Sequence, residues 1–158
     1  MNDLKQNPEQ TAAFNGLIKK ILTGKMSDSE IEDYILNSGK LLDPIGAKIE
    51  FSMLGIDGRF MCTPKDSKNY PYVWDHRVYG FGVADIKCDG NLSTGYADWS
   101  GLWKNTTSVG VTCGEIGIGV VAAVFFREDG MPIGDFRGVP TGVLAFAGAG
   151  GEGGWNKL

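Results

Sequence analysis

One stretch of this sequence, residues 115–126, has the strongest pattern in the chain. Its even-numbered residues are all apolar, and such alternation is typical of a β-strand. Asp129-Gly130 follows it, a pair typical of a tight hairpin. A hairpin this apolar is not stable alone, so the stretch predicts a sandwich or a barrel. We expect the even-numbered face to be buried: Ile116, Ile118, Val120, Ala122, Val124 and Phe126.

The sequence from Ala47 onward has this β character throughout and contains 20 of the 24 glycines. Two further Asp-Gly pairs, Asp57-Gly58 and Asp89-Gly90, are typical of turns. The strands we expect are Ala47–Leu54, Arg59–Thr63, Arg77–Lys87, Asn91–Asp98, Trp103–Thr112, Glu115–Phe126, Met131–Arg137 and Val139–Ala149. Eight strands predict a mainly β fold, an eight-stranded antiparallel β-barrel, with a two-sheet sandwich as the competing architecture.

Residues 1–46 have a helical pattern instead. Asn7-Pro8 is typical of a helix start and Gly24 of a helix end, and Ser27 with Glu30 forms a capping-box pattern for a second helix. The apolar stripes of the two helices are Phe14, Leu17, Ile18, Ile21 and Leu22, then Ile31, Tyr34 and Ile35. We therefore expect an N-terminal helical segment over 1–46, a short helical hairpin, and a β-barrel domain over 47–158.

These two narrow stripes need a surface to lie on, because helices this short are marginal in water. Two surfaces are available to them. One is the odd-numbered face of the strands near Val121 and Ala123, and the other is a partner protein or a membrane.

Composition excludes several kinds of partner and cofactor. The net charge of −4 is spread along the chain without a basic stripe, so we expect no nucleic-acid partner. Cys62, Cys88 and Cys113 show no CxxC spacing and His76 is the only histidine, so we expect no metal site and no cofactor. The cysteines are either buried apolar side chains or one disulfide and a thiol.

The hydropathy of the chain predicts neither a signal peptide nor a transmembrane helix. The first ten residues are polar and do not resemble a signal peptide. The longest apolar run, Ile116–Phe126, has 11 residues. A transmembrane helix needs about 20.

No residue set predicts catalysis. Asp75 and His76 are adjacent, and neighbours on a strand point to opposite faces, so Asp75 cannot readily orient the imidazole. Cys113 shares a strand face with Val109 and Val111, which indicates a core position. The acids Asp85, Asp98, Glu115 and Asp135 are scattered and are expected to face outward. We expect a protein that is not an enzyme.

Five aromatic residues near two loops are the candidate site for a ligand or partner: Tyr70, Tyr72, Trp74, Trp99 and Trp103. Aromatics that do not all fit a small core mark a ligand mouth or an interfacial belt. The alternative is that they close the barrel ends as core plugs.

The last third of the chain resembles a known family. Residues 120–138, VVAAVFFREDGMPIGDFRG, and then TGVLAFAGAGGEGGW, ending at Trp155, are similar to the C-terminal core of the virulence-associated (Vap) proteins of intracellular actinobacterial pathogens. The resemblance implies a compact eight-stranded barrel and a secreted or surface-bound protein without enzymatic activity that acts on host phagosomal or lysosomal membranes. It implies host membrane or lipid as the partner, and it carries over no active-site residue.

Two other functions fit the same barrel. One is a small hydrophobic-ligand binder of the avidin or lipocalin kind, and the other is a barrel enzyme such as a cyclase or isomerase. The size of the interior side chains discriminates among them, because a filled barrel leaves no ligand cavity.

Overall fold

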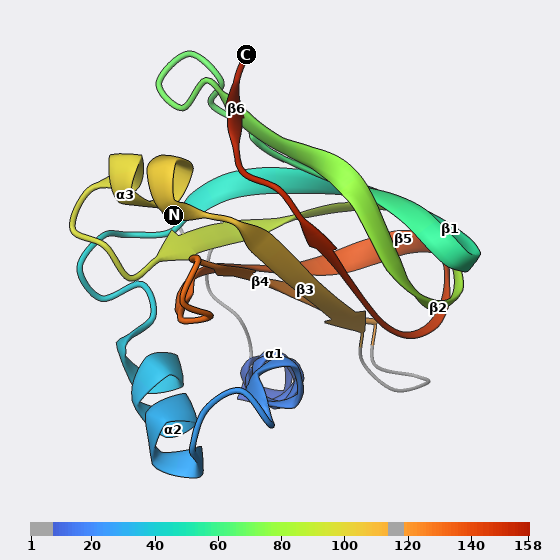
Figure 1. The fold of residues 1–158 in the computed structure, drawn as a ribbon, viewed down its shortest axis with the longest axis horizontal. Coiled ribbons are helices and arrows are strands. Elements are labelled where there is room, and N and C mark those ends of the chain that lie inside the picture. Colours follow the sequence, from blue (N-terminus) through green and yellow to red (C-terminus); the bar gives the residue numbers. More distant parts are fainter. Residues whose placement is uncertain (1–7, 114–118) are drawn as a thin grey trace.

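The computed structural model describes residues 8–113 and 119–158 and is mainly β (Figure 1). Its elements in chain order are α1 (Pro8–Leu22), α2 (Asp28–Asn37), β1 (Ile45–Pro64), β2 (Tyr72–Thr94), α3 (Trp99–Asn105), β3 (Ser108–Cys113), β4 (Val121–Phe126), β5 (Pro132–Glu152) and β6 (Asn156–Lys157). None of these helices is long and apolar enough to cross a membrane.

Strands β1 to β5 form a closed antiparallel barrel. β1 pairs with β2, and β2 pairs with β5. The first part of β5 also pairs with β4 and its last part with β3, and β3 pairs with β4, so the ladder returns on itself. The Lys65 N–H donates to the Gly46 carbonyl at 3.0 Å and joins the two ends of β1. The predicted barrel is therefore confirmed in its class and closure.

The predicted number of strands is wrong, because two of the three Asp-Gly pairs do not form turns. Asp57-Gly58 lies inside β1, which has 20 residues, and Asp89-Gly90 lies inside β2, which has 23. Only Asp129-Gly130 closes a hairpin, with Gly130 at φ 84°. In the barrel, three long strands and two short ones thus replace the eight short strands that were predicted.

A β-bulge bends β1 where the sequence predicted a turn. The pairing with β2 shifts between Gly55, at φ 78°, and Asp57. Such a bulge kinks a strand and changes which side chains face inward. Buried residues are odd-numbered up to Met53 and even-numbered from Phe60. The strands bend at the right-hand end of Figure 1.

Strand β4 is buried on both faces. Its odd-numbered residues belong to the barrel interior: Val121, Ala123 and Phe125. Its even-numbered residues, with the preceding Val120, belong to a second core under the N-terminal helices: Ala122, Val124 and Phe126. The predicted burial of the even-numbered face is confirmed from Val120 to Phe126, whereas Ile116 and Ile118 lie outside the described residues. The largest fully buried interior side chains are Phe51, Phe60, Trp74, Phe125 and Phe136.

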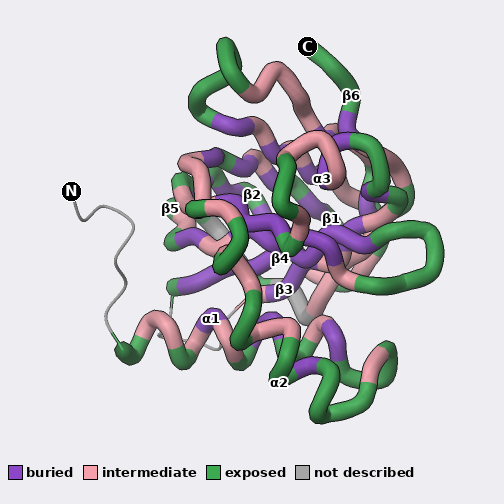
Figure 2. Tube along the Cα trace, turned by 90° about the vertical axis from the view of Figure 1, so that its left-hand side faces the viewer, coloured by how far each residue is buried: buried purple, intermediate pink, exposed green. Residues whose placement is uncertain are grey.

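The two predicted N-terminal helices are present and lie against this barrel wall rather than standing free (Figure 2). Ser27 caps α2 with the predicted box, because its side chain accepts the Glu30 N–H and its N–H donates to the Glu30 carboxylate. Phe14, Leu17, Ile18, Leu22 and Ile31 bury their side chains there. The helices therefore cover the even-numbered face of β4. The odd-numbered face, one of the two surfaces considered for them, fills the barrel instead.

A buried carboxylate ties the helices to the barrel. Asp135 on β5 is fully buried and accepts hydrogen bonds from Tyr34 (2.7 Å), Ser38 (2.8 Å) and Arg137 (3.1 Å). Arg137 in turn donates to Asn15 of α1 at 3.3 Å. Burial, with the charge of Asp135, raises the pKa of Tyr34 well above its ordinary value. Asp135 thus points out of the barrel, as expected, because its neighbour Phe136 fills the interior and its partner Val124 lies on the outer face. It is nevertheless buried, because both helices meet the wall there.

Candidate functional site

The five predicted aromatic residues gather at the end of the barrel that carries α3. Tyr72 stacks on Trp103 with ring centroids 4.9 Å apart, and Trp103 stacks on Trp99 at 5.7 Å. Tyr70 meets Trp99 edge-on at 5.8 Å. Trp74 lies deeper and contacts Phe60 at 5.8 Å. The sequence therefore grouped these residues correctly in space.

The inner part of this cluster, Trp74 and Trp103, is a plug. Trp74 is fully buried and its indole N–H donates to the Gly153 carbonyl at 2.9 Å. Trp155, which the sequence reasoning did not select, packs on Trp103 at 4.8 Å and donates to the Thr106 hydroxyl at 3.1 Å. A buried indole with a satisfied N–H is a core feature. Of the five, only Tyr70, Tyr72 and Trp99 are half-buried. These three residues line an outer groove of about 540 Å³. A binding role for them stays a prediction.

The local chain at this end differs from the predicted strand Trp103–Thr112. Asp98 caps α3 by accepting the Ser100 N–H at 2.8 Å, so Trp99 and Trp103 lie on one helix and β3 begins only at Ser108. Gly101 is needed here, because a Cβ would lie 2.6 Å from the Tyr96 ring. The Asp98-x-Ser100 cap was the available signal.

The residues weighed for catalysis are not assembled. Arg59 holds the Asp75 carboxylate with two hydrogen bonds, 2.6 and 2.8 Å, which lower the pKa of Asp75. His76 lies 2.7 Å from the Gly154 carbonyl through Nε2 and packs against Trp74. Cys113 is at the far end of β3, roughly 17 Å along the strand from Ser108, which is the end near His76.

The two interior cysteines behave as apolar side chains. Cys62 and Cys88 are buried in the barrel core. Burial raises the pKa of Cys88 to about 12, with a smaller contribution from Asp89, and raises the pKa of Cys62 further. Both are therefore poor nucleophiles, since the thiolate is the reactive form.

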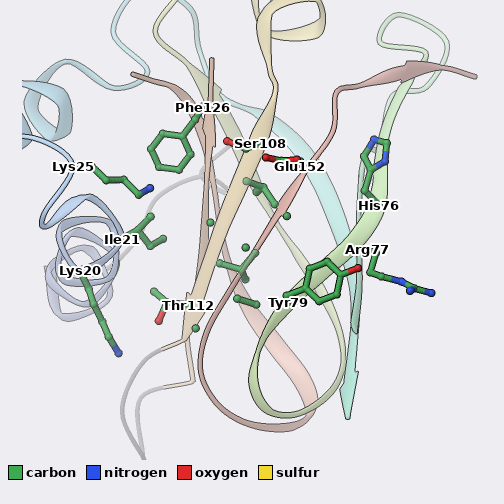
Figure 3. A pocket seen from close by; sticks show the side chains of 17 residues that line it. Lys20, Ile21, Lys25, His76, Arg77, Tyr79, Ser108, Thr112, Phe126 and Glu152 are labelled. Atoms are coloured by element: carbon green, nitrogen blue, oxygen red, sulfur yellow. The ribbon is translucent and has the colours of Figure 1, made fainter. Parts of the chain in front are cut away.

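A second site, absent from the sequence predictions, is a groove between α1 and the barrel, which we call the helix–barrel groove (Figure 3). It has a volume of about 830 Å³, within the range of roughly 300–1,000 Å³ of small-molecule sites. Its floor is formed by β3 and β5, where Gly110, Gly148 and Gly150 carry no side chain. Ile21 and Phe126 form one wall, and β2 forms the other. The glycine-rich run from Gly148 was the signal that could have found it.

Charged residues rim the helix–barrel groove. Lys20 and Lys25 lie on the α1 side, and Arg77 lies across from them on β2 (Figure 3). The Lys25 ammonium stands 5.0 Å above the Phe126 ring, a cation–π contact. Glu152 is the carboxylate of the lining. The groove is thus apolar at its floor and predominantly cationic at its rim.

A third feature is an apolar surface at the bent end of the barrel, opposite the plug. Its five residues, which we call the tip patch, are Leu54 and Ile56 on β1 and Tyr79, Phe81 and Val83 on β2, with exposures from 42% to 81%. They are neighbours, because Leu54 pairs with Val83 and the three β2 residues share one face. Apolar patches of this kind mark interaction surfaces.

Of the comparisons with known proteins, the one with solved structures gives matches. No family model and no curated protein matches the sequence. The solved structures that match include the virulence-associated protein VapB from the intracellular pathogen Rhodococcus equi, with a TM-score of 0.58, and VapD from the same pathogen, with 0.63. Each is 18% identical, and the matches cover 73% and 72% of this chain and 98% and 97% of the other.

The matched share equals the size of the barrel. Residues 45–158 are 114 of the 158 residues, or 72% of the chain, about the share that each match covers. The resemblance noted for residues 120–155 is confirmed at the level of structure. The barrel of this chain has the fold of the Rhodococcus equi virulence-associated proteins.

Proposed function

We propose that this protein is a non-enzymatic, virulence-associated effector, secreted or held at the cell surface, that acts on host phagosomal or lysosomal membranes. The observation that carries the proposal is the match to VapB and VapD over almost their whole length. Both are described as virulence-associated proteins of an intracellular pathogen.

The packing supports a role without catalysis. Large aromatic side chains fill the barrel, including Phe51, Trp74 and Phe136, where an interior-binding protein or a cyclase would need space. His76 and Asp75 are engaged by a backbone carbonyl and by Arg59. These groups serve the fold.

The tip patch supports contact with a membrane. Phe81 is 73% exposed and Leu54 is 81% exposed, so both side chains project outward from the barrel. Tyr79 beside them carries a hydroxyl, and such aromatics favour membrane–water interfaces. Arg77, two residues before Tyr79 in β2, forms an ion pair with Asp57 at 3.5 Å at the edge of the patch.

The experiment is to supply the purified full chain to macrophages and to measure phagosomal pH and lysosomal protease activity. We expect a change with the wild type and its loss in a Leu54→Asp/Phe81→Asp variant, because charge on the tip patch opposes entry into an apolar phase. Leu36→Asp is the matched control, since Leu36 is 64% exposed on α2. An inactive wild type, or a tip variant as active as the control, would overturn the proposal.

The alternative function of a small hydrophobic-ligand binder has one observation in its favour. The interior is filled, but the helix–barrel groove lies outside the barrel wall and has room for a ligand. A ligand there would be held in a different way from that of an avidin or lipocalin.

A further inference from the structure

The two lysines of the helix–barrel groove have no counter-ion in the part of the chain that the structure describes. Among the residues that the structure describes, neither Lys20 nor Lys25 forms an ion pair, whereas the adjacent Lys19 approaches Glu32 at 3.9 Å. The whole chain has a net charge of −4, so this cationic wall runs against the overall balance. Unpaired cations beside an apolar floor match a ligand that carries both an anionic group and an apolar body.

The floor does not suit an extended peptide. Such a peptide is usually held by main-chain hydrogen bonds to an unpaired strand edge. Here β3 pairs with β4 on one side and with β5 on the other, and β5 pairs at Gly150 with both β3 and β2. A ligand on this floor must therefore be held by contact with the bare glycine backbone, which suits a flexible apolar chain.

The charges also give the ligand a direction. In Figure 3, Glu152 and Ser108 lie at one end of the groove and Lys20 and Thr112 at the other. A carboxylate ligand would be repelled by Glu152 and attracted by Lys20.

We propose that the helix–barrel groove binds one long-chain fatty acid, with its alkyl chain along the glycine floor and its carboxylate beside Lys20. Ile21 and Phe126 cover one side of the chain, and Tyr79 covers the other. This site is distinct from the membrane contact assigned to the tip patch, although Tyr79 belongs to both.

The test is titration calorimetry of the full chain with octanoate, decanoate and dodecanoate, each below its micelle concentration. We expect one saturable site, with the Kd falling about four- to fifteenfold for each two methylenes, since each buried methylene adds apolar contact. Lys20→Gln/Lys25→Gln should raise the Kd for dodecanoate about tenfold, and the control Lys40→Gln should leave it unchanged. Gly148→Val should also raise it, because the Cβ enters the floor at ordinary contact distance, 3.6 Å from the Val111 carbonyl oxygen.

Four results would overturn the proposal. They are a wild-type Kd retained by the double lysine variant, equal affinity for dodecanol, complete competition by inorganic phosphate, and binding only to vesicles that contain dodecanoate. If Gly148→Val does not fold, the lysine variants decide alone. Because the lysine variants leave the tip patch intact, their macrophage activity separates a failure of this site from a failure of the proposed function.

Discussion

The two hydrophobic cores of this protein share one strand but are built differently. The barrel interior receives the odd-numbered residues of β4 and packs aromatic rings against one another, as in the 5.0 Å contact between Phe125 and Trp155. The helix-covered wall receives the even-numbered residues and packs them against side chains of α1 and α2 that are mostly aliphatic, with Phe14 as the buried aromatic. Only the wall includes the fully buried carboxylate of Asp135.

This difference separates what makes the barrel from what attaches the helices. The interior depends on apolar burial around a closed hydrogen-bond ladder, which the match to VapB and VapD also spans. The helical layer depends on a charged network as well as on burial. We infer that the barrel is the autonomous unit and that the helices are attached to it.

The largest expected effects come from truncating the two neighbouring phenylalanines of β4. Phe125→Ala and Phe126→Ala should each cost about 3–5 kcal/mol, because both side chains are buried. Urea unfolding measures both. Phe125→Ala should destabilise the whole barrel, whereas hydrogen exchange should show that Phe126→Ala loosens α1 first. A urea midpoint near that of the wild type for either variant would contradict the assigned burial.

Removing the buried carboxylate should come next. Asp135→Ala should cost about 3 kcal/mol, because it leaves Arg137 without its partner and removes the acceptor of Tyr34 and Ser38. Asp129→Ala is the control, since its pair with Arg127 is exposed and should be worth under about 1 kcal/mol. Equal stability of the two variants would show that the network does not hold the helices.

A smaller effect is expected for Tyr34→Phe, about 1 kcal/mol from one lost hydrogen bond. Its pH dependence is specific. Because the pKa of Tyr34 is raised in the folded state, its contribution is complete below the ordinary value of 10.0 and is lost as pH rises above it. Urea midpoints between about pH 8 and about pH 11 should therefore fall more steeply for the wild type than for the variant. Parallel curves would exclude a buried, protonated Tyr34.

The smallest effect is expected from the former candidates for catalysis. His76→Ala and Cys113→Ser should leave biological activity intact, because His76 lies on β2 near the Ser108 end of β3, whereas Cys113 lies at the other end of β3. The macrophage assay measures this. Loss of activity in a folded His76→Ala variant would make the enzyme hypothesis the leading one.

The sequence predicted local features better than long-range ones. The capping box at Ser27, the helix stop at Gly24 and the apolar alternation up to Phe126 depend on near neighbours, and all are present in the structure. Asp57-Gly58 was predicted as a turn, because an Asp-Gly pair does not reveal that β2 continues beside it. The two-sided burial of β4 also depends on distant partners, since its outer face is buried only because α1 and α2 cover it.

The candidate site shows the same limit. The aromatic residues were grouped correctly, yet Trp74 and Trp103 form a plug with Trp155. The role of Trp155 depends on its contact with Trp103, which is 52 residues away in the sequence. The helix–barrel groove needs α1 to lie beside β3, and nothing in either segment alone predicts that placement. The predicted division of the chain at residue 46 stays a prediction.

The most direct test of the autonomous barrel is a chain that begins at Asp43, studied by circular dichroism and urea unfolding. We predict a β-type spectrum and a single cooperative transition, with increased binding of a hydrophobic dye because Val124, Phe126 and their neighbours lose their cover. Retained macrophage activity would locate function on the barrel, and lost activity with cooperative unfolding would locate it on the helices. A chain that is unfolded or unfolds without cooperativity would contradict the claim that the barrel is complete without its helices.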